Sequence, residues 1–469
     1  MIKVNLAWIS EVVAGELVPA ASAGVKISQI TIDSRNIQAG DLFIAIKGPH
    51  FDGHDFVAQV QRLGAAGVIV DHKMDVEIPQ IVVPDTRHAL GQLAAAVKAE
   101  VAPKTIAVTG SSGKTTVREM LAAILREQGE VLATKGNFNN DIGVPLTLLR
   151  LEPQHQFAVI ELGANHRGEI AYTTGLTKPD VALINNVAPA HVEGFGDICG
   201  IARAKTEIFR GLSNVGVAVT WADSEFHEFW MRELQDRPHR IFSSEHAQAD
   251  VWAENIEMDP SGCARFVLCT PHQQASVTLS VPGRHNVNNA LAAATCCFAL
   301  GIPMAQVIRG LSGVAPVPGR MWVHQPTPGL RVIDDTYNAN VGSVRAALDV
   351  LSTLPGYRIF VMGDMGELGA DARSYHEEVG EYAIHAEIDG LFSVGVLSQS
   401  ASEVFNGRGG KHFENKQQLI DALKVEMEVH QVLTILVKGS RSSHMEEVVQ
   451  ALLLQEADHN NNKRGKAAC

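Results

Sequence analysis

The sequence predicts an α/β protein of three domains: a small α/β N-terminal domain, a central parallel sheet with a flanking antiparallel part, and a C-terminal Rossmann-like domain. Three observations lead to this prediction. The chain has 469 residues, which is too long for a single hydrophobic core. Strand-like and helix-like segments alternate from Lys104 onward, as in parallel sheets connected by helices. Residues 313–329 are rich in Pro and Gly, which is typical of an interdomain hinge.

The first predicted domain covers residues 1–103. Its strands are expected in short apolar or alternating segments, namely VKISQITIDSR, DLFIAIKG, AAGVIVD and IPQIVVPD. The segment TRHALGQLAAAVKAEVA predicts a helix, and Pro103 ends this unit.

The second predicted domain covers residues 104–314. KTIAVTG, FAVIELG and DVALINNV are near-continuous apolar runs, as expected for central parallel strands covered on both faces. Helices are expected in TTVREMLAAILREQG, ARAKTEIFRGL and NVNNALAAATCCFALG. Residues 250–283 alternate instead, which predicts antiparallel strands at the flank of the sheet.

The third predicted domain covers residues 315–455. RVIDDT, YRIFVMGD, GLFSVG and VLTILVKGS alternate with helical stretches, and this order predicts a Rossmann-like sheet. The last residues, 456–469, are polar and are expected to form a disordered tail.

Composition and charge exclude several classes of protein. The formal net charge of −13 argues against a general nucleic-acid or anionic-membrane binder, because those need a dominant basic face. The first residues lack the apolar core of a signal peptide, and no run approaches the roughly 18 apolar residues of a membrane helix. The six cysteines form neither a CxxC pair nor a zinc-like spacing. We therefore expect a cytoplasmic protein without stable membrane insertion.

The segment VTGSSGKTTVREML, residues 108–121, joins an apolar strand to a helix. Successive backbone N–H groups in such a Gly-rich turn, together with the helix N-terminus, bind phosphate. Lys114 can reach the β/γ-phosphates, and the Thr115 hydroxyl can ligate Mg²⁺. The G-x-x-G-K-T spacing is shorter than the full Walker pattern, but its strand–helix context favours a nucleotide-binding loop over a plain glycine turn.

Three further side chains lie near this predicted edge of the sheet. Glu161 ends an apolar strand, where a carboxylate is costly unless it is paired or metal-bound, although a helix cap or surface carboxylate is the alternative. His191 follows another central strand and could be structural or a ligand. Lys205, from its own surroundings, indicates only a solvated helix lysine.

These motifs, in this order, resemble those of the Mur ligases, the ATP-dependent amide-forming enzymes of bacterial cell-wall synthesis. The resemblance spans nearly the whole chain and is carried by TGSSGKTT (109–116), KGNFNNDIGVPLTLL (135–149), IELGANHRGEI (160–170), NVAPAHVEGFG (186–196), ARAKTEIF (202–209), PGRHNVNNALAA (282–293), PVPGRM (316–321), DDTYNANVGSV (334–344), MGDMGELG (362–369) and VKGSRSSHMEEVV (437–449). Many such sequences have a proline after the Asn-x-Asn segment, whereas Val341 follows it here.

The resemblance implies an ATP site with Mg²⁺. The phosphate loop would consist of Thr109, Gly110, Ser111, Ser112, Gly113, Lys114, Thr115 and Thr116. Asn288 would contact the adenine side, and Arg320 and Asp335 would close over the phosphates and ribose. The implied catalytic residues are Lys114, Glu161, His191, Lys205 and Arg320. Two Mg²⁺ ions would be served by Thr115, Glu161, His191 and Lys205, the last of these after carbamylation by CO₂.

The resemblance also implies substrate-binding residues. The N-terminal domain would hold a uridine nucleotide through Ser34, Arg35 and Lys47, although Lys47 is equally compatible with a surface lysine. The muramoyl substrate would face Asn137, Asn139, Asn140 and Asp141, for which a plain Asx-rich turn is the alternative. Tyr337 and Asn338 would belong to the closing surface, with domain packing an equal alternative for Tyr337. Arg441 would help orient the incoming amine.

The implied reaction is ATP-dependent amide formation through an acyl phosphate. The chain lacks the N-terminal dinucleotide fingerprint of the alanine-adding family member and the D-N-P-R-like segment of the diamino-acid-adding one. The expected substrates are therefore UDP-N-acetylmuramoyl-tripeptide and D-alanyl-D-alanine, and the expected enzyme is a monomer. The alternatives are another Mur-type ligase, a folylpolyglutamate synthetase-like enzyme, and a non-catalytic ATP-binding regulatory protein. Against the synthetase, 109 residues precede Gly110, whereas its P-loop would lie near the start.

Overall fold

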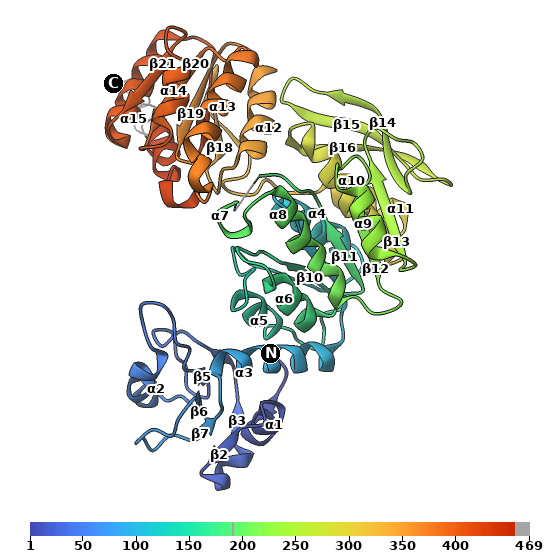
Figure 1. The fold of residues 1–469 in the computed structure, drawn as a ribbon, viewed down its shortest axis with the longest axis vertical. Helices are drawn as coiled ribbons and strands as arrows, with labels where there is room; N and C mark the ends of the chain where they lie inside the picture. Colours follow the sequence, from blue (N-terminus) through green and yellow to red (C-terminus); the bar gives the residue numbers. More distant parts are fainter. Residues whose placement is uncertain (190–191, 455–469) are drawn as a thin grey trace, which may run out of the picture.

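The computed structural model describes residues 1–189 and 192–454 (Figure 1). His191 and the predicted polar tail, residues 456–469, lie outside the described residues. The predicted α/β class is confirmed, because successive parallel sheets are covered by helices along the described chain. Within that part of the chain, no helix combines the length and the apolar character needed to cross a bilayer.

The N-terminal unit is a small mixed sheet in the strand order β2-β7-β6-β5-β4, parallel except for β2. Its strands are β2 (Glu16–Val18), β4 (Ile30–Thr31), β5 (Leu42–Ile44), β6 (Gly67–Val70) and β7 (Gln80–Val82). A separate antiparallel pair joins β1 (Val4–Asn5) to β3 (Lys26–Ile27). The helices are α1 (Leu6–Val12), α2 (Val57–Arg62) and α3 (Thr86–Val101).

Helix α3 connects this unit to the rest of the molecule (Figure 1). It begins because the Asp85 carboxylate accepts the N–H groups of Arg87 and His88, and it ends where Ala102 adopts the left-handed conformation. Its apolar side belongs to one hydrophobic cluster that also contains residues of α1, α5 (Gly143–Leu148) and α6 (Glu169–Thr177). Burial of apolar surface therefore stabilises the junction of the two units.

The central sheet has the order β16-β15-β14-β13-β12-β11-β8-β10-β9. Its strands are β8 (Lys104–Thr109), β9 (Val131–Ala133), β10 (Phe157–Glu161), β11 (Val181–Ile184), β12 (Val217–Trp221), β13 (His239–Ser243), β14 (Val251–Met258), β15 (Cys263–Cys269) and β16 (Gln274–Pro282). The pairings from β9 to β14 are parallel, and β14-β15-β16 are antiparallel, as predicted for the flank. The chain passes from β8 to one side and later returns to its other side, so the carboxyl ends of β8, β10 and β11 meet at a topological switch point.

Helices cover both faces of the central sheet. One face packs against α4 (Lys114–Arg126), α10 (His285–Ala299) and α11 (Met304–Ser312). The other packs against α3, α5 and α6. The remaining helices of this unit are α7 (Val192–Phe195), α8 (Ile198–Thr206) and α9 (His227–Leu234). The near-continuous apolar strands of the sequence are explained by this two-sided burial.

The C-terminal sheet has the order β17-β18-β22-β19-β20-β21, parallel except for β17. Its strands are β17 (Trp322–Thr327), β18 (Leu330–Asp335), β19 (Tyr357–Gly363), β20 (Gly390–Val394), β21 (Gly410–Phe413) and β22 (Leu433–Lys438). Its helices are α12 (Val341–Ser352), α13 (Ala372–His385), α14 (Gln399–Val404), α15 (Lys416–Val429) and a last one over 446–454. Asn340 caps α12 through a capping box with Ser343, so Val341 begins the helix where a proline is commonly accepted.

The predicted hinge over residues 313–329 needs a correction, because its second half is strand β17. This strand lies at the edge of the sheet, and its pairing with β18 shifts register between His324 and Thr327, around Pro326. Proline is tolerated at such an edge because its missing N–H costs no central hydrogen bond. The irregular connection between the two sheets is therefore shorter than predicted.

Candidate functional site

A cavity of 1310 Å³ lies where the carboxyl ends of the central strands face the C-terminal sheet. The predicted site residues that line it are Ser111, Ser112, Gly113, Lys114, Thr116, Asn137, Asn139, Asn140, Asp141, Glu161, Lys205, Asn288, Arg320, Asp335, Tyr337, Asn338 and Arg441. Elements separated by more than three hundred residues in the sequence therefore contribute to one site.

The predicted phosphate loop joins β8 to α4. Gly113 has a φ of +74° and precedes the helix, a left-handed conformation that glycine adopts without strain. The Lys114 ammonium donates to the Gly110 carbonyl at 2.7 Å. Ser112 is held from outside the loop, since its N–H donates to the Asn186 side chain at 2.9 Å. The loop is thus shaped by its own backbone and by the segment after β11.

Gly113→Ala is expected to lower the affinity for ATP and to destabilise the protein by about 1–3 kcal/mol. A Cβ at this position would lie 2.6 Å from Asn289 Oδ1 and 2.7 Å from Asn185 Nδ2, besides requiring positive φ. Chemical denaturation and nucleotide titration check this result. Gly301→Ala is the matched control, because Gly301 also has positive φ, a Cβ there meets nothing within 4 Å, and it does not line the cavity.

Glu161, at the end of β10, is the centre of a buried polar network. Its Oε2 accepts from the Thr115 hydroxyl at 3.1 Å and from Arg118 Nη1 at 3.2 Å. Its Oε1 accepts from Asn139 Nδ2 at 3.0 Å. The carboxylate is 2% exposed, so these donors offset the cost of burying its charge.

Arg320 reaches this network from the connection between the two sheets. Its Nη2 donates to the Thr115 hydroxyl at 3.0 Å, and its guanidinium lies 3.9 Å from the centre of the Tyr337 ring. The sequence leaves two roles open for Tyr337, the closing surface of the site and domain packing. In the structure the ring packs against Arg320 through this cation–π contact and also lines the cavity. Within the described chain, Arg320 Nε and Asn288 Oδ1 are buried without a hydrogen-bond partner.

Asp335, at the end of β18, holds the same connection from the other side. Its Oδ1 accepts from the Met321 N–H at 3.1 Å, and its Oδ2 accepts from the Lys438 ammonium at 2.6 Å. Lys438 also donates to the Asn338 carbonyl at 2.9 Å. Burial lowers the pKa of Lys438, and the Asp335 carboxylate opposes that shift. Asp335 therefore fixes the segment that carries Arg320.

Of two further lysines of the cavity wall, Lys205 is buried and Lys114 is half-buried. Burial lowers the pKa of Lys114, while Glu161 acts in the opposite direction. Lys205, on α8, is 4% exposed, and no hydrogen bond or ion pair of its side-chain nitrogen is found among the described residues. Burial, with a smaller contribution from Lys114, lowers the pKa of Lys205 well below the ordinary lysine value. The local sequence around Lys205 predicts a solvated helix lysine, and this prediction is wrong because the side chain is buried.

The Asn-rich loop after β9 contains the Asx turn that the sequence allows, and its side chains line the cavity. Asn139 contacts Glu161, whereas Asn140 accepts the Gly143 N–H at 2.8 Å as in a local Asx turn. Asp141 forms an ion pair of 3.0 Å with Arg87 of α3. The loop is therefore tied to the N-terminal unit as well as to β10.

The other predicted site residues among those that the structure describes lie outside the cavity lining. Thr109 is buried and donates to the Leu162 carbonyl at 2.8 Å, while Gly110 and Thr115 contact the site through Lys114 and Glu161. Ser34, Arg35 and Lys47 lie in the N-terminal unit, where they were expected.

The two cations predicted in the N-terminal unit have partners within it. Arg35 forms two hydrogen bonds with Asp33, at 2.8 and 3.0 Å, and this contact lowers the pKa of Asp33 to about 2. Lys47 lies 3.8 Å from Asp52 and is largely exposed. Both would have to exchange these contacts to bind a substrate phosphate.

Sequence reasoning missed several residues of the site. Arg118 has the position of an ordinary helix arginine, and only the fold shows that it is buried against Glu161. Asn185, Asn186 and Asn289 form the polar support of the phosphate loop. Lys438 ends an apolar strand, and the same argument that singled out Glu161 would have found it.

Comparison with known proteins defines the class to which this site belongs. Residues 26–98, 108–297 and 319–441 match three family models, described as the Mur ligase family catalytic domain, the Mur ligase middle domain and the Mur ligase glutamate ligase domain. The chain belongs to the Mur ligase family.

Individual relatives match over almost the whole chain. The UDP-N-acetylmuramoyl-tripeptide–D-alanyl-D-alanine ligase of Escherichia coli (strain K12) is 47% identical over 452 residues, covering 96% of this chain and 99% of that protein. The crystal structure of MurF from Acinetobacter baumannii has a TM-score of 0.92 and 38% identity, covering 97% and 99% of the two chains. MurF ligase from Thermotoga maritima in complex with ADP has a TM-score of 0.82 and 28% identity, covering 92% and 98%.

Proposed function

We propose that this chain is an ATP-dependent, ADP-forming ligase that joins D-alanyl-D-alanine to UDP-N-acetylmuramoyl-tripeptide, giving the pentapeptide precursor of peptidoglycan. The observation that carries the proposal is the convergence of Lys114, Glu161 and Arg320 from three segments on one cavity. The substrates follow from the E. coli relative at 47% identity, which is named for this reaction. A non-catalytic regulatory protein would not need this complete charged set.

The described residues fit ATP. The loop at the start of α4 presents backbone N–H groups and a lysine, as phosphate sites do. The buried, unpartnered Asn288 Oδ1 and Arg320 Nε are polar atoms that a ligand in the cavity can satisfy. In this proposal Asn288 lies at the adenine, and Arg320 lies at the phosphates.

The oxygen donors around β10 fit Mg²⁺. Thr115 and Glu161 supply a hydroxyl and a carboxylate 3.1 Å apart, the ligand types that this hard ion prefers. Bound there, the ion would screen the negative charge of the phosphates. The predicted ligand His191 lies outside the described residues.

Lys205 is proposed to act as a carbamate. A lysine that stays neutral keeps the lone pair that attacks CO₂; the new N–C bond forms as the nitrogen loses a proton, leaving a carboxylate-like group. Burial favours the neutral amine of Lys205, and the neighbouring Lys114 adds to this effect. The modified side chain would supply the oxygen ligands for a second Mg²⁺ that an amine cannot.

The most demanding step of the reaction is the transfer of the γ-phosphate to the tripeptide carboxylate. The tripeptide carboxylate must approach the γ-phosphate, and both carry negative charge. Lys114 and Arg320 place positive charges beside this approach, which stabilises the charge that develops. The carboxylate oxygen bonds to the γ-phosphorus as ADP leaves. The dipeptide amine next attacks the acyl carbon, phosphate departs and the amine loses a proton.

We propose a role for each of the three domains. Residues 1–103 hold the uridine end, through Ser34, Arg35 and Lys47; residues 104–314 hold ATP; and residues 315–455 bring Arg320, Asp335 and Arg441 to the cavity. All of the described segments that line the cavity come from one chain, which supports a monomer. The described cysteines are all free, which supports the reducing cytoplasm as the place of action.

Phosphate release tests this function. Purified protein with ATP, Mg²⁺ and UDP-N-acetylmuramoyl-tripeptide is given D-alanyl-D-alanine, single D-alanine or no amine. Sustained release with the dipeptide alone, together with an amide product of the matching mass, is the expected result. Turnover with a different amine or acceptor would place the protein elsewhere in the family, and tight ATP binding without any turnover would favour the regulatory alternative.

A further inference from the structure

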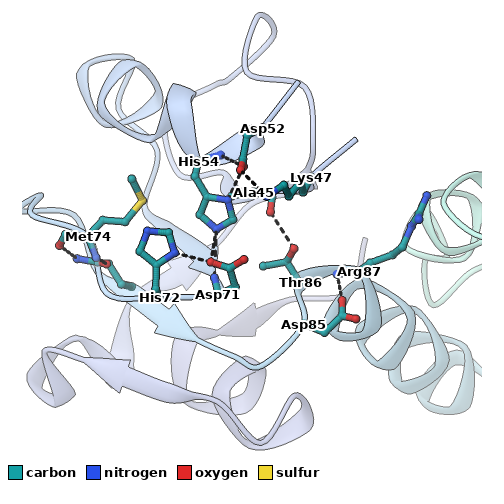
Figure 2. A network of polar contacts seen from close by, with 11 residues as sticks. Ala45, Lys47, Asp52, His54, Asp71, His72, Met74, Asp85, Thr86 and Arg87 are labelled. Atoms are coloured by element: carbon teal, nitrogen blue, oxygen red, sulfur yellow. Dashed lines mark hydrogen bonds and ion pairs between the residues drawn. The ribbon is translucent and has the colours of Figure 1, made fainter. Parts of the chain in front are cut away.

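The N-terminal unit contains a cluster of potential metal ligands that takes no part in the cavity described above. His54 lies in a short turn of helix after β5, and Asp71 and His72 directly follow β6. One ligand atom from each of these three residues lies within 4.8 Å of the other two. Figure 2 shows the two imidazole rings side by side with the Asp71 carboxylate next to them.

The hydrogen bonds around His54 indicate which of its ring nitrogens carries the lone pair. Asp52 Oδ1 lies 2.6 Å from His54 Nδ1, and the Asp71 N–H donates to His54 Nε2 at 3.1 Å (Figure 2). The proton therefore belongs on Nδ1, and Nε2 carries the lone pair. A histidine that donates one N–H to a carboxylate and presents the other nitrogen outward is the usual arrangement of a metal-bound histidine.

The Nε2 atom of His54 lies next to the side chain of Asp71 as well as its N–H. Asp71 Oδ1 is 3.2 Å from His54 Nε2 and 2.5 Å from His72 Nδ1, so His72 Nδ1–H donates to Asp71. To bind an ion through Nδ1, His72 moves its proton to Nε2, and Asp71 exchanges this hydrogen bond for coordination. Ligand atoms in a tetrahedral site with bonds of about 2.0–2.1 Å lie roughly 3.3 Å apart, close to the His54–Asp71 separation. The His54 side chain is 6% exposed and hydrogen-bonded at both ring nitrogens, whereas the His72 side chain is 64% exposed, so coordination at the same spacing requires only a shift of the exposed ring.

We propose that His54, Asp71 and His72 bind one divalent transition-metal ion of the Zn²⁺ class, with Asp52 orienting His54. Two imidazole nitrogens and one carboxylate oxygen suit Zn²⁺ and its neighbours and leave a fourth position for water. Mg²⁺ is excluded as the preferred ion, because it favours oxygen ligands. The ion takes the lone pair that now accepts the Asp71 N–H, so binding exchanges that contact for coordination.

The consequence of this site is local. It joins the segment around His54 to the end of β6, and Asp52 also lies 3.8 Å from Lys47. None of the three ligands lines the cavity between the two large sheets. A negative result for metal binding would therefore not count against the proposed ATP site, and a negative result for the ligase reaction would not count against the metal site.

A second cluster, Asp223, Glu245 and His246, serves as an internal comparison. It offers one histidine instead of two, and its Asp223 Oδ1 already accepts from the Ser243 hydroxyl at 2.5 Å. Its His246–Asp223 contact is 3.7 Å long. We expect this cluster to bind transition metals more weakly.

Cobalt titration of the full-length protein tests the proposal. The protein is freed of metal with a chelator, kept in Mg²⁺, and titrated with Co²⁺ while the visible d–d absorption of tetrahedral cobalt is recorded. Wild type is expected to bind one equivalent with this absorption, and Zn²⁺ should displace it. His72→Ala, a change on an exposed side chain, should weaken binding at least about 10-fold and remove the tetrahedral absorption. Asp52→Asn should weaken it about 10-fold.

His50→Ala is the matched control, because His50 is an exposed histidine of the same unit that contributes no ligand to the cluster. It should behave as wild type, and so should His246→Ala. The proposal is overturned if His72→Ala binds cobalt as wild type does. It is equally overturned if one equivalent binds without tetrahedral absorption, or if His50→Ala or His246→Ala removes that absorption.

Discussion

Lys114→Ala is expected to lower kcat/KM for ATP by about 10²–10³-fold. The lysine stands at the start of α4 in the cavity wall, where its charge faces the phosphates in the proposed complex. Lys114 is the one lysine among residues 109–116, so no second lysine of the phosphate loop can supply the missing charge. Phosphate release under saturating dipeptide measures the effect.

Lys104→Ala controls for the general loss of a lysine. Lys104 begins β8, at the opposite end of the strand that leads into the loop, and its partner is Asp180 at 3.1 Å. Its replacement should change kcat/KM by less than about twofold, because an exposed ion pair contributes little. An active Lys114→Ala variant would contradict the proposed arrangement of ATP.

Lys205→Met is expected to reduce turnover about 10²-fold while leaving the protein as stable as before or about 1–3 kcal/mol more stable. The side chain is 4% exposed, and methionine removes a buried polar group while keeping most of its volume. Loss of activity with a gain in stability distinguishes a functional lysine from a structural one. Turnover and denaturant unfolding of the same preparation provide both values.

In CO₂-free buffer, the free energy of unfolding of Lys205→Met is also expected to depend on pH differently from that of wild type. The pKa of Lys205 is lower in the folded state, so the unfolded state binds more protons between the folded-state pKa and the ordinary lysine pKa. The free energy of unfolding of wild type therefore rises with pH across that window, and Lys205→Met should lose this share of the rise.

Arg203→Met is the matched control on the same helix, because Arg203 is exposed. It should retain both turnover and the wild-type pH dependence. Full turnover in Lys205→Met would contradict the proposed carbamate.

Much of the fold could be predicted from periodicity alone. β8 and α4 were identified from an apolar strand followed by a Gly-rich turn, and the switch from continuous to alternating apolar residues located the antiparallel β15 and β16. Strand β17 could not be predicted, because Pro326 and the surrounding Pro and Gly residues favour a hinge. Its structure depends on hairpin pairing with β18, which begins just beyond the segment and which the Pro and Gly content of 313–329 does not indicate.

Site residues could be predicted where a short sequence motif indicates their role. They were harder to predict where the role depends on packing against distant segments. The phosphate loop and Glu161 follow from spacing and from a charge at the end of an apolar strand. The burial of Arg118 and Lys205 follows from neighbours far away in the chain, so their own helices make them look solvated. The family resemblance indicated a role for Lys205, but Arg118 was found only in the structure.

Transfer of an oxygen-isotope label tests the central claim most directly, because it follows the carboxylate through the reaction. UDP-N-acetylmuramoyl-tripeptide labelled in its terminal carboxylate oxygens is incubated with ATP, Mg²⁺ and D-alanyl-D-alanine, and the released phosphate is analysed by mass spectrometry. An acyl phosphate predicts one labelled oxygen in each phosphate released, matched by one new amide bond. Amide formation with unlabelled phosphate would contradict activation of the carboxylate by the γ-phosphate, and release of unlabelled phosphate without an amide would indicate a simple ATPase.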